Sequence, residues 1–403
     1  MVPAKERERW RALPCFQKAR KRALDLCRGA HQPRSWQSIA LMKGGMNARM
    51  AGMKRLLSTI AAMLFLASCT QLYQPTGSGE IPHTASVERQ LRQDVSALAE
   101  DIGERNHYHQ EAYERARAYI KGEFEAAGYT VDEQRFTIPA QRRFEGAAGK
   151  TATNLEVRKP GTDPNAPWLI IGAHYDTRVG MKNWHCHGPA IPGKAGTPGA
   201  NDNGSGIATV LTLARALKNI PTRNGIIFVA YANEEPPFFQ SDWMGSRQHA
   251  RKIVNELGKD RIAGMMTPET LGVYSPRSNK KRNSKLAGSL VGILDRCDYV
   301  AFMSTITGKR YAHSCAKQFA SVSRFPVRAV TFGYLTRGIA WSDDWSYMKE
   351  GIPSFAITDT AYMRCDDYHE TSDTADKLDY KQFGEVVHGL IRMVTALAGG
   401  TPQ

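Results

Sequence analysis

Short runs of consecutive apolar residues alternate, along most of this chain, with stretches in which apolar residues recur every three or four positions. Ile226–Tyr231 and Trp168–Ala173 are of the first kind, and their length indicates strands buried on both faces. His109–Ala127 is of the second kind, with Ala112, Ala116, Ile120, Phe124 and Ala127 at helical spacing and Gly128 as a stop. The pattern therefore predicts alternating strands and helices.

The same reasoning, applied along the chain, predicts a series of elements. Strands are expected at 130–138, 154–158, 168–173, 226–231, 262–266, 327–332 and 354–357, and helices at 87–102, 109–127, 203–219, 243–257, 284–305, 308–323 and 380–397. Strands that alternate with helices favour a largely parallel sheet covered on both faces. We therefore predict an α/β fold, a three-layer sandwich with a mixed, mostly parallel central sheet and helices on both faces, in one domain over residues 85–400.

The charge of the chain is unevenly distributed. The 403 residues carry a formal net charge of +15, but residues 1–68 hold 14 Lys and Arg against 3 Asp and Glu. The remainder holds 40 basic and 36 acidic residues, so the basic excess belongs to the N-terminus. We therefore expect no nucleic-acid-binding face on the folded domain.

The N-terminal region has the composition of an export signal. Lys54 and Arg55 precede the apolar run LLSTIAAMLFLAS and Cys69. This run is shorter than the ~20 residues that a membrane span needs, so a signal peptide over 53–68 is favoured over a transmembrane anchor. Residues 66–69, LASC, resemble a bacterial lipoprotein box, which implies a lipid anchor on Cys69 and a place in the bacterial cell envelope, at the periplasmic side of the outer membrane.

The segments on either side of this signal are interpreted from composition. Residues 69–84 contain Pro75, Gly77 and Gly79 and are expected to be a tether. Residues 1–52 are basic and without a clear apolar period. They are either an over-extended start, with translation beginning at Met50 or Met53, or a genuine basic arm.

Acids and imidazoles follow the predicted strands at five places. They are His174 with Asp176, Asp202, Glu234 with Glu235, Glu269, and His369. The carboxyl ends of parallel strands meet at one edge of a sheet, where ligands bind in open α/β folds, so we expect these groups to converge. Two imidazoles and three carboxylates suit zinc in sites that leave room for water. Because residues two apart in a strand face the same way, Asp176 can orient His174.

The motifs around these residues resemble a known family. GAHYDT (172–177), PGANDNGSG (198–206), NEE (233–235), PETLG (268–272) and YHETSDT (368–374) are similar, in order and spacing, to those of the co-catalytic dizinc exopeptidases of the aminopeptidase S and aminopeptidase Y type. The resemblance covers roughly residues 85–400. It implies two Zn²⁺ per chain, bridged by Asp202, with one site completed by His174 and Glu269 and the other by Glu235 and His369. It also implies that Glu234 is the general base and that Asp176 lies behind His174. Finally, it implies a cis peptide bond between Asp202 and Asn203.

Two positions depart from that family's pattern. Glu269 stands where many relatives have aspartate, and Asp344, within SDDW, stands where many have histidine. A glutamate is a tolerable longer ligand, and the second change affects contacts on the substrate side.

Taken as a whole, the resemblance implies an aminopeptidase acting on peptides. Open alternatives are a carboxypeptidase, a glutaminyl-cyclase-like enzyme with a single zinc, and a non-catalytic envelope binding protein; the oligomeric state is undetermined.

The cysteines after Cys69 are even in number. In an exported protein, Cys186, Cys297, Cys315 and Cys365 suggest disulfide bridges with three possible connectivities. If the loops that carry His174 and His369 meet at the metals, a Cys186–Cys365 bridge would tie them together. Cys297 and Cys315 would then form the second pair.

Overall fold

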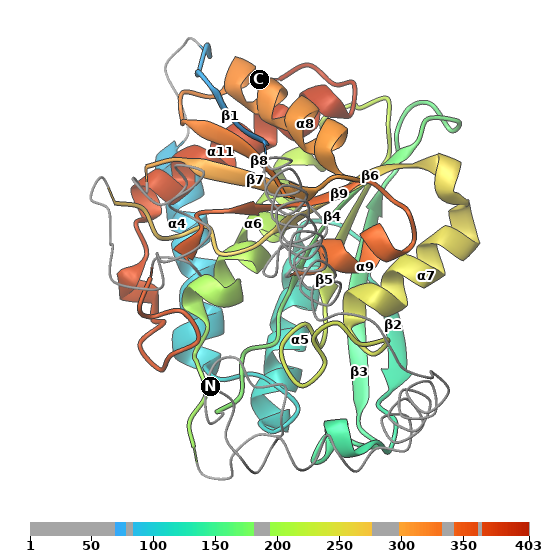
Figure 1. Cartoon of the computed structure of the whole chain (residues 1–403), viewed down its shortest axis with the longest axis vertical. Coiled ribbons are helices and arrows are strands. Elements are labelled where there is room, and N and C mark those ends of the chain that lie inside the picture. The colour runs from blue at the N-terminus through green and yellow to red at the C-terminus, as the bar shows by residue number, and fades with distance from the viewer. Residues whose placement is uncertain are drawn as a thin grey trace, which may run out of the picture. The chain divides into compact units, whose positions relative to one another are not determined.

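A computed structural model describes residues 69–77, 84–180, 194–275, 298–332, 342–361 and 365–402. Within these residues the chain forms a nine-stranded sheet with the order β1-β8-β7-β9-β6-β4-β5-β3-β2 (Figure 1). The strands are β1 Cys69–Tyr73, β2 Asp132–Thr137, β3 Thr151–Lys159, β4 Trp168–His174, β5 Ile226–Tyr231, β6 Ile262–Pro268, β7 Val300–Thr305, β8 Val327–Phe332 and β9 Ser354–Thr358. The helices are α4 Thr84–Ser96, α5 Gln110–Ala126, α6 Ser205–Leu217, α7 Gly245–Leu257, α8 Lys309–Val322, α9 Asp344–Lys349 and α11 Tyr380–Leu397.

The centre of the sheet is parallel and its edges are not. Strands β5, β4, β6 and β9 run in one direction. β7 and β8 are parallel to each other but antiparallel to β9, and β1, β3 and β2 pair antiparallel with their neighbours. The four central strands therefore present their carboxyl ends at one edge of the sheet, and the expected mixed, mostly parallel sheet is confirmed.

Side chains alternate between two buried layers, as the continuous apolar runs require. In β5, Phe228 faces the core beneath α4, α5, α6, α8 and α11, whereas Val229 faces the core beneath α7 and α9. All six residues of β5 are buried. Burial of an aliphatic or aromatic side chain contributes roughly 1.5–3 kcal/mol, so such strands hold the helices on both faces. The three-layer arrangement is confirmed.

Two segments differ from the sequence-based expectation. Val300–Thr305 was expected to be the end of a helix but forms β7, whose six residues are all buried. Such a run lacks the alternation that separates a strand from a buried helix. Cys69–Tyr73 was assigned to a tether but pairs with β8 as the edge strand β1, because a partner distant in sequence supplies the ladder. Three expected features lie outside the described residues: the basic leader over 1–52, the signal peptide over 53–68, and the part of the expected helix over 284–297. Residues 78–83 of the expected tether lie outside them as well.

Helix α6 begins two residues later than expected, at Ser205, after a tight turn over Ala200–Gly204. Among the described residues, no helix is long and apolar enough to cross a membrane.

Candidate metal centre

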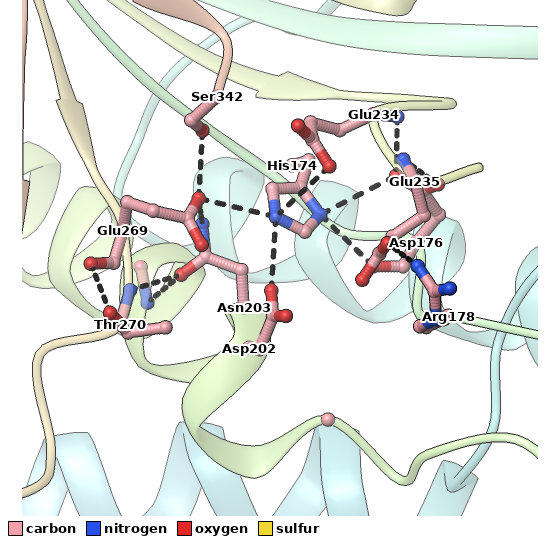
Figure 2. A network of polar contacts seen from close by, with 12 residues as sticks. His174, Asp176, Arg178, Asp202, Asn203, Glu234, Glu235, Glu269, Thr270 and Ser342 are labelled. Carbon is pink, nitrogen blue, oxygen red and sulfur yellow. Dashed lines mark hydrogen bonds and ion pairs between the residues drawn. The ribbon is translucent and has the colours of Figure 1, made fainter. Parts of the chain in front are cut away.

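The seven candidate residues converge at the carboxyl edge of the parallel strands. Figure 2 shows all of them except His369. β4 ends at His174 and leads to Asp176, β5 leads to Glu234 and Glu235, and β6 leads to Glu269. Asp202 lies in the turn before α6, and His369 lies in the loop after β9. The Asp202–Asn203 peptide bond is cis, as the family resemblance implies.

Two groups of three donors share one carboxylate. His174 Nε2 lies 3.3 Å from Asp202 Oδ1 and 3.3 Å from Glu269 Oε2. His369 Nε2 lies 3.0 Å from Asp202 Oδ2 and 3.3 Å from Glu235 Oε1. Within each group the donor atoms lie within 4.8 Å of one another, close enough to hold a metal ion. Asp202 therefore offers one oxygen to each group.

Several of these donor atoms have no hydrogen-bond partner although they are buried. They include His174 Nε2, Asp202 Oδ2 and both carboxylate oxygens of Glu235. A buried polar atom without a partner is costly, and most such atoms in native proteins are satisfied. Nitrogen and carboxylate oxygen donors that face one another suit a cation such as Zn²⁺. The donor set therefore fits two metal ions.

The protonation of the imidazoles and the shared carboxylate is set by the crowding of opposite charges. Burial alone would lower the pKa of His174, yet the carboxylates of Glu269 and Glu234 raise it well above its ordinary value. Burial would also lower the pKa of His369, but the carboxylates of Glu235 and Asp202 raise it to about 9. Burial would raise the pKa of Asp202, but His174 and His369 hold it below its usual range. In the absence of metal, the imidazoles are therefore the cations that balance this acidic cluster.

Two glutamates respond in the opposite direction. Burial raises the pKa of Glu234 well above its usual value. The charge of His174 lowers this pKa, whereas the charges of Glu235 and Glu269 raise it further. Burial also raises the pKa of Glu269 to about 7, despite the nearby His174. Glu234 contributes no donor to either three-residue group, and its Oε2 lies 3.9 Å from His174 Nε2. Glu234 is therefore a buried carboxyl that lies beside the two groups without belonging to either.

Asp176 connects the first imidazole to the glutamate pair. Its Oδ1 lies 3.5 Å from His174 Nδ1, and its backbone oxygen lies 3.1 Å from the same nitrogen. The backbone N–H groups of Glu234 and Glu235 donate to its two carboxylate oxygens at 2.9 and 3.1 Å. Asp176 therefore fixes the ring of His174 and the backbone that aims both glutamates.

Further polar residues hold the donors in place. Asn203 Nδ2 and Ser342 Oγ donate to Glu269 Oε2 at 3.0 and 2.7 Å, which restrains a side chain one methylene longer than aspartate. Asp373 accepts the backbone N–H groups of Asn201 and Asp202 at 2.9 and 3.0 Å. Partners of this kind orient metal ligands and strengthen their binding.

Arg105 is a positioning residue that the sequence did not reveal. Its side chain is fully buried, and the hydrogen bonds that it donates within the described residues all go to backbone carbonyls. They belong to Tyr175 at 2.8 Å, Leu98 at 3.1 Å, Gly103 at 3.3 Å, Pro198 at 2.6 Å and Gly199 at 2.8 Å. One guanidinium thus joins the chain that follows His174 to the turn that precedes Asp202.

Of the two residues that depart from the family pattern, Asp344 is buried and Glu269 is partly exposed. Asp344, which stands at the expected histidine position, begins α9 and lies outside both donor groups. Burial raises the pKa of Asp344 to about 7 and that of its neighbour Asp343 to about 8.

The expected Cys186–Cys365 and Cys297–Cys315 disulfides are not formed, because Cys315 and Cys365 are both thiols. The thiol of Cys365 donates to Asp367 Oδ2 at 3.6 Å.

Comparisons with known proteins agree with this geometry. A family model described as "Peptidase family M28" matches residues 154–394. A curated relative named "Uncharacterized protein YfbL", from Escherichia coli (strain K12), is 31% identical over 343 residues, which cover 85% of this chain and 98% of the relative.

Solved structures share the fold at lower identity. BSAP, a zinc aminopeptidase from Bacillus subtilis, aligns with a TM-score of 0.57 at 14% identity, over 80% of this chain and 97% of its own. A glutaminyl cyclase from Porphyromonas gingivalis aligns with a TM-score of 0.54 at 18% identity, over 78% of this chain and 98% of its own. The fold therefore accommodates both classes of enzyme, and the side chains of the site have to distinguish them.

Proposed function

Because this chain belongs to peptidase family M28, and is a metallopeptidase, we propose that it is a zinc exopeptidase, specifically an aminopeptidase that removes N-terminal residues from peptides. The observation that carries the proposal is the pair of donor groups that share Asp202. The site motifs also resemble those of the aminopeptidase S and aminopeptidase Y type. We propose two Zn²⁺ per chain, one held by His174, Asp202 and Glu269 and one by Asp202, Glu235 and His369.

The chemistry divides between the metals and the protein. Zn²⁺ ions held by the two donor groups would supply a water of lowered pKa and would polarise a substrate carbonyl. Glu234 accepts the proton of that water as it attacks the scissile carbonyl, and returns the proton to the leaving amine. Asp176 holds His174 and, through the two backbone N–H groups, keeps Glu234 and Glu235 aimed at their separate tasks. Glu234 and Asp176 are the proposed catalytic pair.

The complete donor set argues against the alternatives. A glutaminyl-cyclase-like enzyme with a single zinc has no use for a second group of three donors, yet His174, Asp202 and Glu269 remain together. A non-catalytic binding protein has no need of Glu234 as a buried carboxyl beside both groups. A carboxypeptidase is distinguished by its substrate, because it requires a free carboxylate and an aminopeptidase requires a free amine.

We also propose that the protein is exported and lipid-anchored through Cys69 in the bacterial envelope. The basic residues, apolar run and LASC sequence before Cys69 support this proposal. Mass spectrometry of the N-terminal peptide of the membrane-extracted protein would detect an acylated Cys69. An unmodified cysteine in the mature protein would contradict the anchor.

A peptide panel tests the proposed activity. The protein is incubated with aminoacyl peptides and with the same peptides blocked at the amine or at the carboxyl terminus, with and without a chelator. We expect cleavage of every peptide with a free amine, no cleavage of N-blocked peptides, and loss of activity with the chelator that added zinc restores. Cleavage that depends on a free carboxyl terminus would instead establish a carboxypeptidase, and cyclisation of N-terminal glutamine without hydrolysis would establish a cyclase.

A further inference from the structure

The residue before the two site glutamates has a backbone conformation that few side chains adopt. Asn233 is buried and has a φ of 59°, in the left-handed region. The residue before it, Ala232, is fixed at the end of β5, where its N–H donates to Asn154 Oδ1 at 2.9 Å and its carbonyl accepts the N–H of Gly245 at 2.6 Å. Glycine adopts the left-handed region freely, asparagine tolerates it, and β-branched residues are outliers there. The chain therefore leaves a fixed strand end through a turn that restricts which residue can stand at position 233.

The turn at Asn233 makes two consecutive N–H groups available to one carboxylate. The N–H groups of Glu234 and Glu235 donate to the two oxygens of Asp176 at 2.9 and 3.1 Å. In an extended strand, consecutive N–H groups point to opposite sides, so this pair needs a change of chain direction just before it. A left-handed residue in a turn brings successive N–H groups to one side, where they bind an anionic group. The conformation of Asn233 therefore permits the double contact with Asp176.

The same turn sends the two glutamate side chains to different imidazoles. Glu234 Oε2 lies 3.9 Å from His174 Nε2, whereas Glu235 Oε1 lies 3.3 Å from His369 Nε2. Figure 2 shows both glutamates beside Asp176, with the carboxylate of Glu234 reaching toward His174. Adjacent residues thus take separate places in the site because the backbone before them is turned.

A pair of aromatic rings also holds the turn. Tyr113 Oη on α5 donates to Asn233 Oδ1 at 3.3 Å, and the Tyr113 ring stacks on that of Tyr175 with centroids 5.0 Å apart. Both tyrosines are buried, and Tyr175 lies between His174 and Asp176 in the sequence. The turn is therefore joined to the end of β4 through the interior as well as through Asp176.

We propose that Asn233 is a positioning residue whose left-handed turn separates the base Glu234 from the ligand Glu235. With a negative φ at position 233, the two N–H groups would no longer both face Asp176, and both carboxylates would move. A misplacement of about 1 Å costs about 10²-fold in rate, and loss of a supporting contact costs about 10–100-fold in metal affinity. The proposal rests on the proposed function of the two glutamates, so zinc affinity is measured beside turnover.

Substitutions at position 233 separate the backbone conformation from the contacts of the side chain. Asn233→Gly removes the whole side chain but accepts the left-handed backbone, whereas Asn233→Ala keeps Cβ and resists it, and Asn233→Val resists it most. On an aminoacyl peptide with a free amine, we expect kcat to stay within about threefold of wild type in Asn233→Gly. It should fall about 10-fold in Asn233→Ala and about 100-fold in Asn233→Val, with KM unchanged. In equilibrium dialysis, one of the two zinc affinities should fall about 10-fold in Asn233→Val and remain that of wild type in Asn233→Gly.

Gln240 provides a matched control in the same loop. It is also left-handed, with a φ of 52°, and it is exposed. Gln240→Val meets the same backbone conflict and should lower the melting temperature about as much as Asn233→Val, by about 5 °C. Its kcat and both zinc affinities should stay those of wild type, because no site glutamate follows this turn.

The order of two small substitutions decides the question, even where Asn233→Val does not fold. If side-chain contacts were what mattered, Asn233→Gly would be no more active than Asn233→Ala, and that result would overturn the role of the turn. A folded Asn233→Val with the kcat and zinc affinities of wild type would overturn it as well. A wild-type protein that binds two zinc ions but cleaves no free-amine peptide would instead contradict the proposed function, and the zinc affinities of the variants would still test Asn233.

Discussion

Replacement of Arg105 by lysine tests whether the metal centre depends on one buried guanidinium. The lysine keeps the positive charge but offers one nitrogen where the arginine nitrogens reach five backbone carbonyls. A buried group left without its partner costs about 1–3 kcal/mol, and breaking a buried charged network costs about 3–5 kcal/mol. At roughly 2–4 °C per kcal/mol, the melting temperature should fall by about 10 °C.

The same substitution should weaken metal binding, because the lost carbonyl contacts hold the chain after His174 and the turn before Asp202. A competitive zinc titration should report a loss of affinity of about 10–100-fold. Arg115→Lys is the matched control, since Arg115 is exposed and donates to a single carbonyl, that of Asp101. A melting temperature within about 2 °C of wild type, together with unchanged zinc affinity, would refute this role for Arg105.

Three further outcomes are expected. Burial lowers the pKa of His107 to about 4, below its unfolded value, so its contribution to stability is present above pH 6.5 and is lost as the pH falls toward 4. Between pH 7.5 and pH 5 the free energy of unfolding, measured in urea, should therefore fall by about 2 kcal/mol less in His107→Phe than in the wild type. An equal fall in both proteins would exclude the effect. Ser342→Ala removes a hydrogen bond from Glu269 and should weaken one of two zinc affinities about 10-fold in equilibrium dialysis, an effect absent if Ser342 is not a support. Asp373→Asn places an amide N–H donor against the backbone N–H groups of Asn201 and Asp202, so it should destabilise the protein by about 1–3 kcal/mol in thermal unfolding. An unchanged thermal transition would contradict the assigned contact.

The candidate donors could be predicted from sequence because each follows a strand that is easy to identify. Trp168–His174 and Ile226–Tyr231 are uninterrupted apolar runs, and the rules of parallel sheets bring their carboxyl ends together. The positions of His174, Glu234 and Glu235 at that edge therefore followed before any contact was known.

The supporting residues could not be predicted in the same way. Arg105 binds backbone carbonyls, which every residue possesses, so no sequence pattern marks its partners. Ser342 reaches Glu269 from a segment 73 residues away, a contact that only the packing of β6 and β9 creates. β1 was missed for a related reason, since Pro75 and Gly77 dominate the composition while the pairing comes from β8.

In the proposed mechanism, Glu234 moves the proton while five other residues hold two zinc ions. The most direct test of this mechanism is Glu234→Gln, with zinc counted by elemental analysis and turnover measured on an aminoacyl peptide with a free amine. We expect two zinc ions per chain and turnover reduced about 10²–10⁴-fold, because the amide keeps the shape and cannot accept the proton. Glu235→Gln should instead lose zinc from one site. Near-normal turnover by the Glu234 variant, or a single zinc in the wild-type protein, would contradict these roles.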